Sequence, residues 1–200
     1  VRYWAASARL GTDAAFDEGQ MKIGRRLANK LLNAGRFALS FELPAGVTQV
    51  SEPIDQAMLA ALREVVDSAT KAFDAYDHTK ALEITETFFW TFTDDYLELV
   101  KERAYGNSGQ SAQEIGSAVI ALREALAILV RLFAPFIPFA AEEVWSWWQQ
   151  GSVHLSPWPH TSEISFEDAA LMQVASTALV QIRKSKSDAK LSMKAEIKTA

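Results

Sequence analysis

Residues 17–39 read DEGQMKIGRRLANKLLNAGRFAL, and their pattern decides the fold class. Apolar and small residues recur at intervals of three and four, which is the period of a helix and not of a strand. The stretch from Asp13 to Asp17 comes at the start of this run and offers side-chain acceptors for the first helical turn. The stretch is therefore predicted to form a helix with a face of small residues that a neighbouring helix can approach closely.

The same period covers most of the 200 residues, and strand patterns are nearly absent. Besides 17–39, helices are expected over a short opening segment, 1–10, and over about 54–76, 78–104, 112–133 and 166–184. Pro135 and Pro138 end one helix and begin another. Long amphipathic helices joined by short loops predict an all-α fold, an antiparallel helical bundle.

One face of the helix predicted over 17–39 combines cations, amides and an aromatic ring, a set that suits single-stranded nucleic acid. Cations meet phosphates, amides meet base edges, and a ring offers a stacking platform. The candidate residues are Arg26, Asn29, Lys30, Asn33, Arg36 and Phe37. The competing interpretation is an ordinary solvated face, with Phe37 packed in the core.

A second candidate line lies on the helix predicted over 78–104. Trp90, Asp94, Leu97 and Lys101 follow one another at four, three and four residues, so they share a face. Other apolar residues of this helix suffice for the core stripe, which leaves Trp90 and Leu97 for an interface. Packing of all these aromatic residues between helices is the alternative.

Charge is segregated along the chain. The net charge is −5, but residues 1–37 and 181–200 carry +4 each while the residues between them carry −13. Such segregation is expected if both ends of the chain face a polyanion, and chance clustering on solvated faces is the alternative. The basic cluster near the end comprises Arg183, Lys184, Lys186 and Lys190.

No pattern of catalytic or metal-binding residues stands out. Cysteine is absent, which excludes disulfides, thiolate metal sites and a cysteine nucleophile. The histidines, His78, His154 and His160, are scattered, and Gly106 and Gly109 indicate a turn rather than a phosphate cradle. No apolar run approaches the roughly 18 residues of a membrane span. We therefore expect no catalytic residue, no metal site, no membrane partner and a cytoplasmic location.

Five segments, taken together and in order, resemble one enzyme class. They read VRYWAASARLGTD (1–13), RRLANKLLNAGRF (25–37), FFWTFTDDYLELVK (88–101), LFAPFIPFAAEEVW (132–145) and SVHLSPWP (152–159). They are similar to the C-terminal, anticodon-binding region of class Ia aminoacyl-tRNA synthetases. The opening segment, the DDYLE segment and the closing IRKSKSDAKLSMK (182–194) resemble the valyl-tRNA synthetases within that class.

The resemblance implies a division of the chain and a function. Residues 17–184 would form a helical bundle that binds the anticodon stem-loop of valine tRNA, 1–16 would end the stem-contact fold, and 185–200 would begin a C-terminal element or linker. The valyl enzymes attach valine to their tRNA using ATP with magnesium, and this part would supply recognition with no cofactor of its own. The catalytic and editing domains would belong to a longer, generally monomeric parent chain, and an opening at Val1 without methionine is expected for such a piece.

The resemblance also implies roles for single residues. The family's anticodon contacts match Lys30 and Phe37, and a third falls near Leu97. Asp94 is expected to accept a hydrogen bond from the exocyclic amine of a base. Many relatives carry a base-contacting arginine near residue 19, where this chain has Gly19, so that contact is not expected here.

The RKSKS stretch, 183–187, resembles the Lys-Met-Ser-Lys-Ser signature that holds ATP in this class. It lacks the methionine and follows the bundle segments at the end of a predicted helix, so we do not expect an ATP loop. Our hypothesis is that its basic cluster touches the tRNA backbone or anchors a C-terminal element. A solvated helix end is the alternative.

Two other functions are consistent with the sequence. The first is the anticodon-binding domain of an isoleucyl-tRNA synthetase, which shares the segment at 132–145. The second is a helical protein-interaction bundle that uses Trp90 and Leu97 as hot spots.

Overall fold

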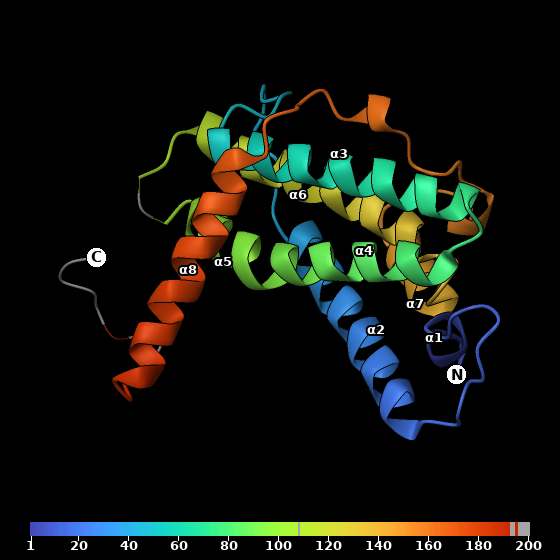
Figure 1. The fold of residues 1–200 in the computed structure, drawn as a ribbon. Coiled ribbons are helices and arrows are strands. Elements are labelled where there is room, and N and C mark those ends of the chain that lie inside the picture. Colours follow the sequence, from blue (N-terminus) through green and yellow to red (C-terminus); the bar gives the residue numbers. More distant parts are fainter. Residues whose placement is uncertain (108, 193–194, 196–200) are drawn as a thin grey trace.

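The computed structural model describes residues 1–107, 109–192 and 195. Within these residues the chain is helical and forms no strand (Figure 1). The elements are α1 (Arg2–Ala6), α2 (Glu18–Leu39), α3 (Pro53–Asp74), α4 (His78–Thr91), η1 (Phe92–Tyr96), α5 (Leu97–Tyr105), α6 (Ala112–Phe133), α7 (Pro138–Ser146), η2 (Val153–Leu155), η3 (Thr161–Glu163) and α8 (Ala170–Asp188). The predicted all-α class is confirmed.

Helix α2 matches its prediction closely. Asp17 caps it, since its Oδ1 accepts hydrogen bonds from the backbone N–H groups of Gly19, at 2.7 Å, and Gln20, at 3.4 Å. Its apolar side is buried, with Leu27 and Leu31 fully excluded from solvent. The helix therefore forms where local capping and amphipathic period agree.

The small residues of α2 allow the close approaches that the sequence predicted. A Cβ atom at Gly24 would lie 2.6 Å from the Cβ of Tyr3, and one at Gly35 would lie 2.8 Å from Cγ1 of Val144. Real Cβ atoms do not approach so closely, so larger side chains at these positions would push away α1 and α7 respectively. Glycine here fixes how tightly two neighbours pack on α2.

The segment predicted as one helix over 78–104 is helical throughout, but one of its turns is wider than an α-helical turn. Helices α4 and α5 are joined by η1, a single π-helical turn. The π-helical turn contains more residues than an α-helical turn. The buried residues on this face are spaced four apart; they are Phe92, Tyr96, Val100 and Ala104. The core thus takes Val100, while Leu99 stays 39% exposed.

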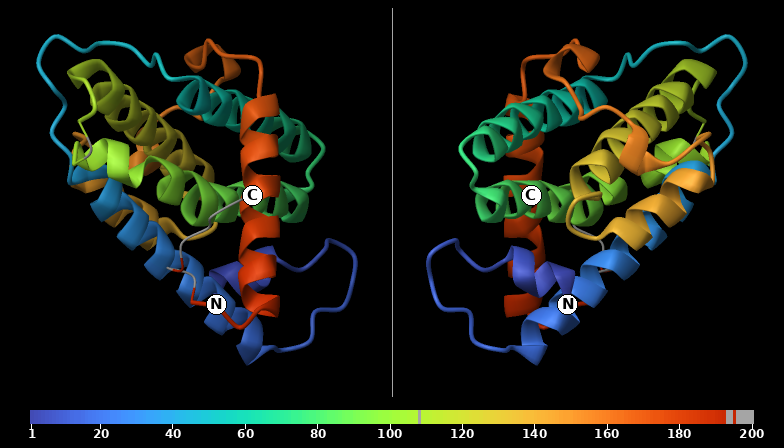
Figure 2. Two further views of the ribbon diagram at one scale, coloured as in Figure 1. Left: turned by 90° about the vertical axis from the view of Figure 1, so that its left-hand side faces the viewer. Right: turned by 90° about the vertical axis from the view of Figure 1, so that its right-hand side faces the viewer.

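Helix α6 lies at the centre of the bundle, and the other long helices surround it. It packs against α2, α3, α4, α5 and α7, and most of its residues are buried. Figure 1 shows α3 and α4 side by side, with α2 running obliquely beneath them. Helix α8 crosses the outside of the bundle, where it contacts α3 and η1 (Figure 2). Consequently α2, η1, α5 and α8 are brought to one region of the surface.

A buried polar cluster joins α5 to the centre of the bundle. Asp55 is completely buried and accepts hydrogen bonds from Tyr96 Oη at 2.8 Å, Ser117 Oγ at 2.6 Å and the guanidinium of Arg103 at 2.6 and 2.8 Å. These hydrogen bonds satisfy a charge that would otherwise be costly to bury. The cluster connects α3, η1, α5 and α6, and so it fixes the position of the wide turn.

The helices at the two ends of the chain differ in length from the predicted ones. Helix α1 is shorter than the predicted opening helix and packs on α2, while the Thr79 hydroxyl donates to the carbonyls of Ala6 and Ala8. Helix α8 begins later than predicted and runs through the expected boundary at 184, to Asp188. Residues 193–194 and 196–200, part of the expected C-terminal element, lie outside the described residues.

Candidate nucleic-acid interface

The two lines of residues predicted from helical spacing meet at Lys30. Its Nζ lies 2.8 Å from Oδ1 of Asp94 and 5.8 Å from the ring centroid of Trp90, so α2 is joined to both α4 and η1. The Trp90 indole donates to Glu86 at 3.2 Å. About a third of the Lys30 side chain, 35%, and half of the Asp94 side chain, 52%, remain exposed. The ammonium is thus positioned by a carboxylate and a ring while it stays open to solvent.

Phe37 lies two turns further along α2 in a cluster of three rings. Its ring centroid is 4.9 Å from that of Phe41 and 6.3 Å from that of Tyr105, both at nearly perpendicular angles. Phe37 is half-buried and packs against the core, so each of the two sequence interpretations describes part of its environment. The exposed part of the ring is held in one orientation, as a stacking platform requires.

The line from Trp90 to Lys101 also lies between core and solvent. Trp90 and Leu97 are half-buried and pack against the core, rather than being wholly left over from it. Lys101 forms an ion pair with Glu98 at 2.5 Å, and this hydrogen bond is the main reason that its pKa is raised. Lys101 therefore keeps its positive charge throughout the neutral range.

Arg183, one residue of the basic cluster, binds the turn η1 that contains Asp94. Its guanidinium forms an ion pair with Asp95 at 2.5 Å and donates to the backbone carbonyl of Asp94. The RKSKS stretch lies inside α8 and is helical, which is unlike a loop that wraps phosphates. Helix α8 is thereby held against the wide turn that carries Asp94.

Other predicted residues lie on the same helices without joining this constellation. Arg26, Asn29 and Asn33 are exposed on α2, beside Lys30. Arg36 turns toward α7, where its guanidinium carbon lies 5.6 Å from the ring centroid of Trp147. On α8 and just after it, the side chains of the predicted backbone contacts are exposed or half-buried; they are Lys184, Lys186 and Lys190.

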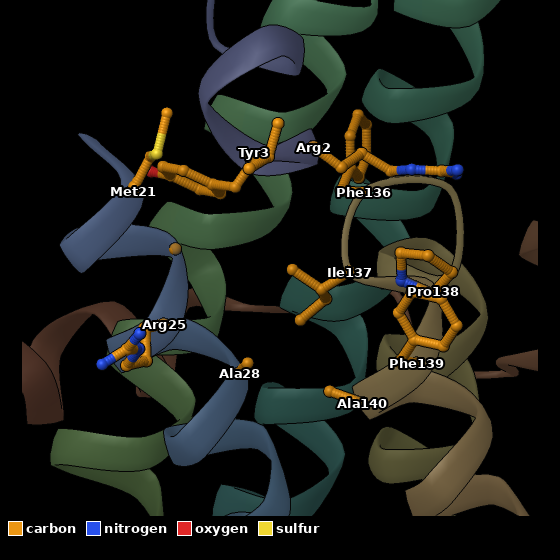
Figure 3. Close-up of a pocket in the computed structure, with 12 residues that line it drawn as sticks. Arg2, Tyr3, Met21, Arg25, Ala28, Phe136, Ile137, Pro138, Phe139 and Ala140 are labelled. Carbon is orange, nitrogen blue, oxygen red and sulfur yellow. The ribbon is translucent and has the colours of Figure 1, made fainter. Parts of the chain in front are cut away.

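A separate hollow of about 460 Å³ lies on another side of α2 (Figure 3). Its walls are mostly apolar and come from α1, the first half of α2 and the start of α7, with Arg2 and Arg25 at its edges. Phe139 lies at this hollow and is 89% exposed. None of the RNA-contacting candidates lines the hollow, so it is distinct from the surface around Lys30.

Sequence reasoning missed Tyr105, which is 55% exposed and touches both Phe37 and Phe41. The predicted helix ends at about 104, just before the turn indicated by Gly106 and Gly109, and so leaves Tyr105 outside it. In the structure Tyr105 is the last residue of α5 and follows Lys101 by four positions. Spacing alone could have found it, because four residues continue the line on one helix face.

The described part of the chain offers few other kinds of site. Within it, no helix is long and apolar enough to cross a lipid bilayer. The same residues contain no group of three or more histidine, aspartate or glutamate side chains arranged to hold a metal ion.

Comparison with known proteins gives the family. A family model described as the anticodon-binding domain of tRNA ligase matches residues 55–200. The chain belongs to this family. The antiparallel helical bundle predicted from the sequence is thus an anticodon-binding domain, and the matched residues contain α4 to α8 and all but the first two residues of α3.

Similar proteins cover the rest of the chain as well. A valine–tRNA ligase of Leifsonia xyli subsp. xyli is 57% identical over 100% of this chain, and one of Thermobifida fusca is 57% identical over 98%. A third, of Cutibacterium acnes, is 52% identical over 100% of the chain. The aligned parts make up 24%, 23% and 23% of those proteins, so this anticodon-binding domain spans about a quarter of their length.

Proposed function

We propose that this chain is the anticodon-recognition part of a valine–tRNA ligase, the enzyme that joins valine to its tRNA with the use of ATP. The proposal is supported by the similarity to valine–tRNA ligases over the whole chain and by membership of the anticodon-binding family. The partner would be the anticodon stem-loop of valine tRNA. Valine, ATP and magnesium would be bound by the catalytic part of a parent chain, and the parent would act as a monomer in the cytoplasm.

The observation that carries the proposal is the meeting of two independent residue lines at Lys30. Cations on α2, half-exposed rings and a carboxylate on η1 lie next to one another in the fold. Single-stranded RNA offers a matching set of groups: phosphates for the cations, faces for the rings and amines for the carboxylate. A protein hot spot would instead be expected in a well-packed, desolvated pocket, whereas the Lys30 and Asp94 side chains are 35% and 52% exposed.

Each side chain then has a role in binding an opened anticodon loop. Phe37 and Leu97 would stack on unpaired bases, at about 1–3 kcal/mol per stacked base. Lys30, Arg26 and Asn33 would bind phosphates and base edges, with Asn29 and Arg36 beside them. Oδ1 of Asp94 accepts hydrogen bonds from the Lys30 ammonium and the Thr93 hydroxyl. Among the described residues, Oδ2 of Asp94 accepts no hydrogen bond. Oδ2 would therefore accept a hydrogen bond from the exocyclic amine of a base.

The remaining candidates would act on the RNA backbone. Lys101 is paired with Glu98 in the free protein and would contact a phosphate when RNA is bound. Arg183 already binds Asp95 through one side of its guanidinium, so its role would be to hold α8 in place. Lys184, Lys186 and Lys190 would then meet phosphates of the stem.

The test is RNA binding by the 200-residue chain, measured with a hairpin that carries the valine anticodon loop. Lys30→Ala and Phe37→Ala should each weaken binding at least fivefold. Two matched controls are Lys71→Ala, an exposed lysine on α3, and Phe139→Ala, an exposed ring at the separate hollow, and both should bind normally. Equal affinities for all four variants would exclude the proposed surface.

Two further arms separate the proposal from its alternatives. Affinity should fall with salt by about 0.7 log units per log unit of salt for each single-strand phosphate contacted, and a flat response would exclude phosphate binding. A hairpin with an isoleucine anticodon loop should bind more weakly than the valine hairpin. The reverse order would assign the domain to the isoleucyl enzymes.

A further inference from the structure

Tyr105 is an exposed ring whose orientation is fixed by two other rings. Its centroid lies 5.0 Å from that of Phe41 at an interplanar angle of 76°, and 6.3 Å from that of Phe37 at 82°. Phe41 is only 6% exposed and anchors the cluster, while Tyr105 is 55% exposed. Edge-to-face contacts of this kind are favourable, so the ring is held in place while much of its surface stays open.

The backbone also fixes where the Tyr105 ring stands. Gly106 follows it in the left-handed region, at φ 68°, and ends α5 with its N–H bonded to the Arg103 carbonyl at 3.0 Å. A Cβ at Gly106 would lie 2.9 Å from Cδ1 of Ile115, so the turn packs directly against α6. Arg103 is itself bound to buried Asp55. The end of α5 is thus rigid, and the ring is preorganised for binding.

The surroundings of Tyr105 indicate what kind of partner it fits. Lys101 lies one turn before it on the same helix, and Leu97 lies one turn before Lys101. On α2 the Tyr105 ring contacts Phe37, and Asn33 is exposed one turn before Phe37 on the same helix. The Tyr105 ring, the Lys101 ammonium and the Asn33 amide together suit the binding of one nucleotide. Its base would stack on the ring, and its phosphate would bind the ammonium. A wholly apolar partner would take the Lys101–Glu98 ion pair and the exposed Asn33 amide out of water without offering either of them a new hydrogen bond.

We propose that Tyr105 is a further base-stacking residue, and that the rings of Tyr105 and Phe37 together bind one unpaired base of the RNA loop. This inference rests on the proposed function and adds a binding residue to it. Lys101 contacts the phosphate of the same nucleotide. The line from Trp90 to Lys101 therefore continues for one more turn, and both of its ends meet α2, one at Lys30 and the other at Phe37.

The experiment uses the 200-residue chain and a valine anticodon hairpin in which each loop position in turn carries 2-aminopurine, a base whose fluorescence falls when it stacks. Tyr105→Ala should weaken binding about 5- to 100-fold and should abolish the fluorescence change at one loop position. Tyr105→Phe should retain both affinity and signal, because it keeps the ring. Phe139→Ala, which removes an exposed ring elsewhere, should leave both unchanged.

Tyr105→Leu separates stacking from packing. Leucine still covers Phe41 but offers no flat ring, so this variant should keep its thermal unfolding midpoint and lose affinity and signal as the alanine variant does. Normal binding by Tyr105→Leu, or an unchanged fluorescence response at every loop position, would overturn the inference. If Lys30→Ala weakens binding while the Tyr105 variants do not, only the role of Tyr105 fails. If none of these variants weakens binding, the proposed function fails as well.

Discussion

Lys30 on α2 and Asp94 on η1 are 64 positions apart in the sequence, yet Nζ and Oδ1 are 2.8 Å apart in the fold. Each side chain is exposed enough that the pair adds only about 0.2–1 kcal/mol to folding stability. Its value would lie in recognition, because Asp94 fixes the direction of the ammonium and Lys30 neutralises the carboxylate near RNA phosphates. Residues of α2 and η1 would thus form a single RNA-binding site.

Lys30 and Asp94 should therefore be coupled in RNA binding. We expect Lys30→Ala, Asp94→Ala and the double variant to deviate from additivity by at least about 0.5 kcal/mol, since the two groups touch. The measurement is the affinity of the four proteins for one valine anticodon hairpin. The same cycle on Lys71 and Asp67, an exposed pair on α3 with a 2.6 Å contact, should show no effect on RNA affinity. Strict additivity at Lys30 and Asp94 would mean that they act separately.

Arg183 should hold the second half of α8 against the bundle. Met172 is the one buried residue of α8, near its start, and Arg183 binds Asp95 and the Asp94 carbonyl much further along. Because the Arg183 side chain is 38% exposed, we assign these contacts about 1 kcal/mol. Arg183→Ala should then raise amide hydrogen exchange in 176–188 about fivefold, with little change in the global unfolding midpoint.

Lys184→Ala provides the matched control for Arg183, because Lys184 is the adjacent residue of α8 and is exposed. It removes one positive charge from the same helix without touching Asp95. Exchange in 176–188 should stay at the wild-type rate in this variant. Equal rates in Arg183→Ala and wild type would show that α8 is held by its other contacts.

Much of the bundle could be predicted because it depends on local pattern. The period of α2, its cap at Asp17 and its close-packing glycines are all properties of a short stretch, and the structure confirms them. The helix at 112–133 was predicted with its bounds as observed. The faces that contain Lys30 and Trp90 followed from helical spacing in the same way.

What the sequence did not reveal depends on contacts between distant residues. The π-turn η1 is fixed by the hydrogen bond from Tyr96 to Asp55, 41 positions away, and it decides that Val100 rather than Leu99 is buried. The ion pair of Arg183 with Asp95 spans 88 positions. Helical period contains no information about such pairs.

The ion pair between Glu163 and Arg131 should make stability depend on pH. Partial burial alone would raise the pKa of Glu163, but hydrogen bonds from the Arg131 guanidinium and the His160 backbone N–H outweigh it, so the pKa is lowered. A carboxyl group with a lowered folded pKa stabilises the fold above its unfolded pKa, about 4.3, and loses this contribution as the pH falls through the folded pKa. The pair therefore stabilises the loop after α7 at neutral pH.

Glu163→Gln tests this pH dependence. At about pH 7 the variant should unfold at a lower urea concentration than the wild type, and the difference should shrink as the pH falls through the lowered pKa of Glu163 and the wild-type carboxyl group becomes protonated. Glu167→Gln, a change in the same part of the chain at a carboxylate that is 76% exposed, should show a much smaller difference at neutral pH. A constant difference between Glu163→Gln and wild type across the range would contradict the pKa assignment.

The largest loss of stability should come from Asp55. Its carboxylate is fully buried and pairs with Arg103, whose side chain is only 14% exposed, and it also accepts from Tyr96 and Ser117. Asp55→Ala leaves the guanidinium and two hydroxyl groups without their acceptor, which should cost about 3–5 kcal/mol in the free energy of unfolding. Urea unfolding measures this directly.

Asp67→Ala on the same helix removes an exposed carboxylate paired with Lys71, so its loss should stay within about 0.5 kcal/mol. A ligand-binding role for Asp55 would instead show as lost RNA affinity in a variant of unchanged stability. Because Asp55 lies beneath η1 and α5, we expect RNA affinity to fall only in step with unfolding. A small stability loss for Asp55→Ala would mean that the wide turn is held chiefly by apolar packing of Phe92 and Tyr96.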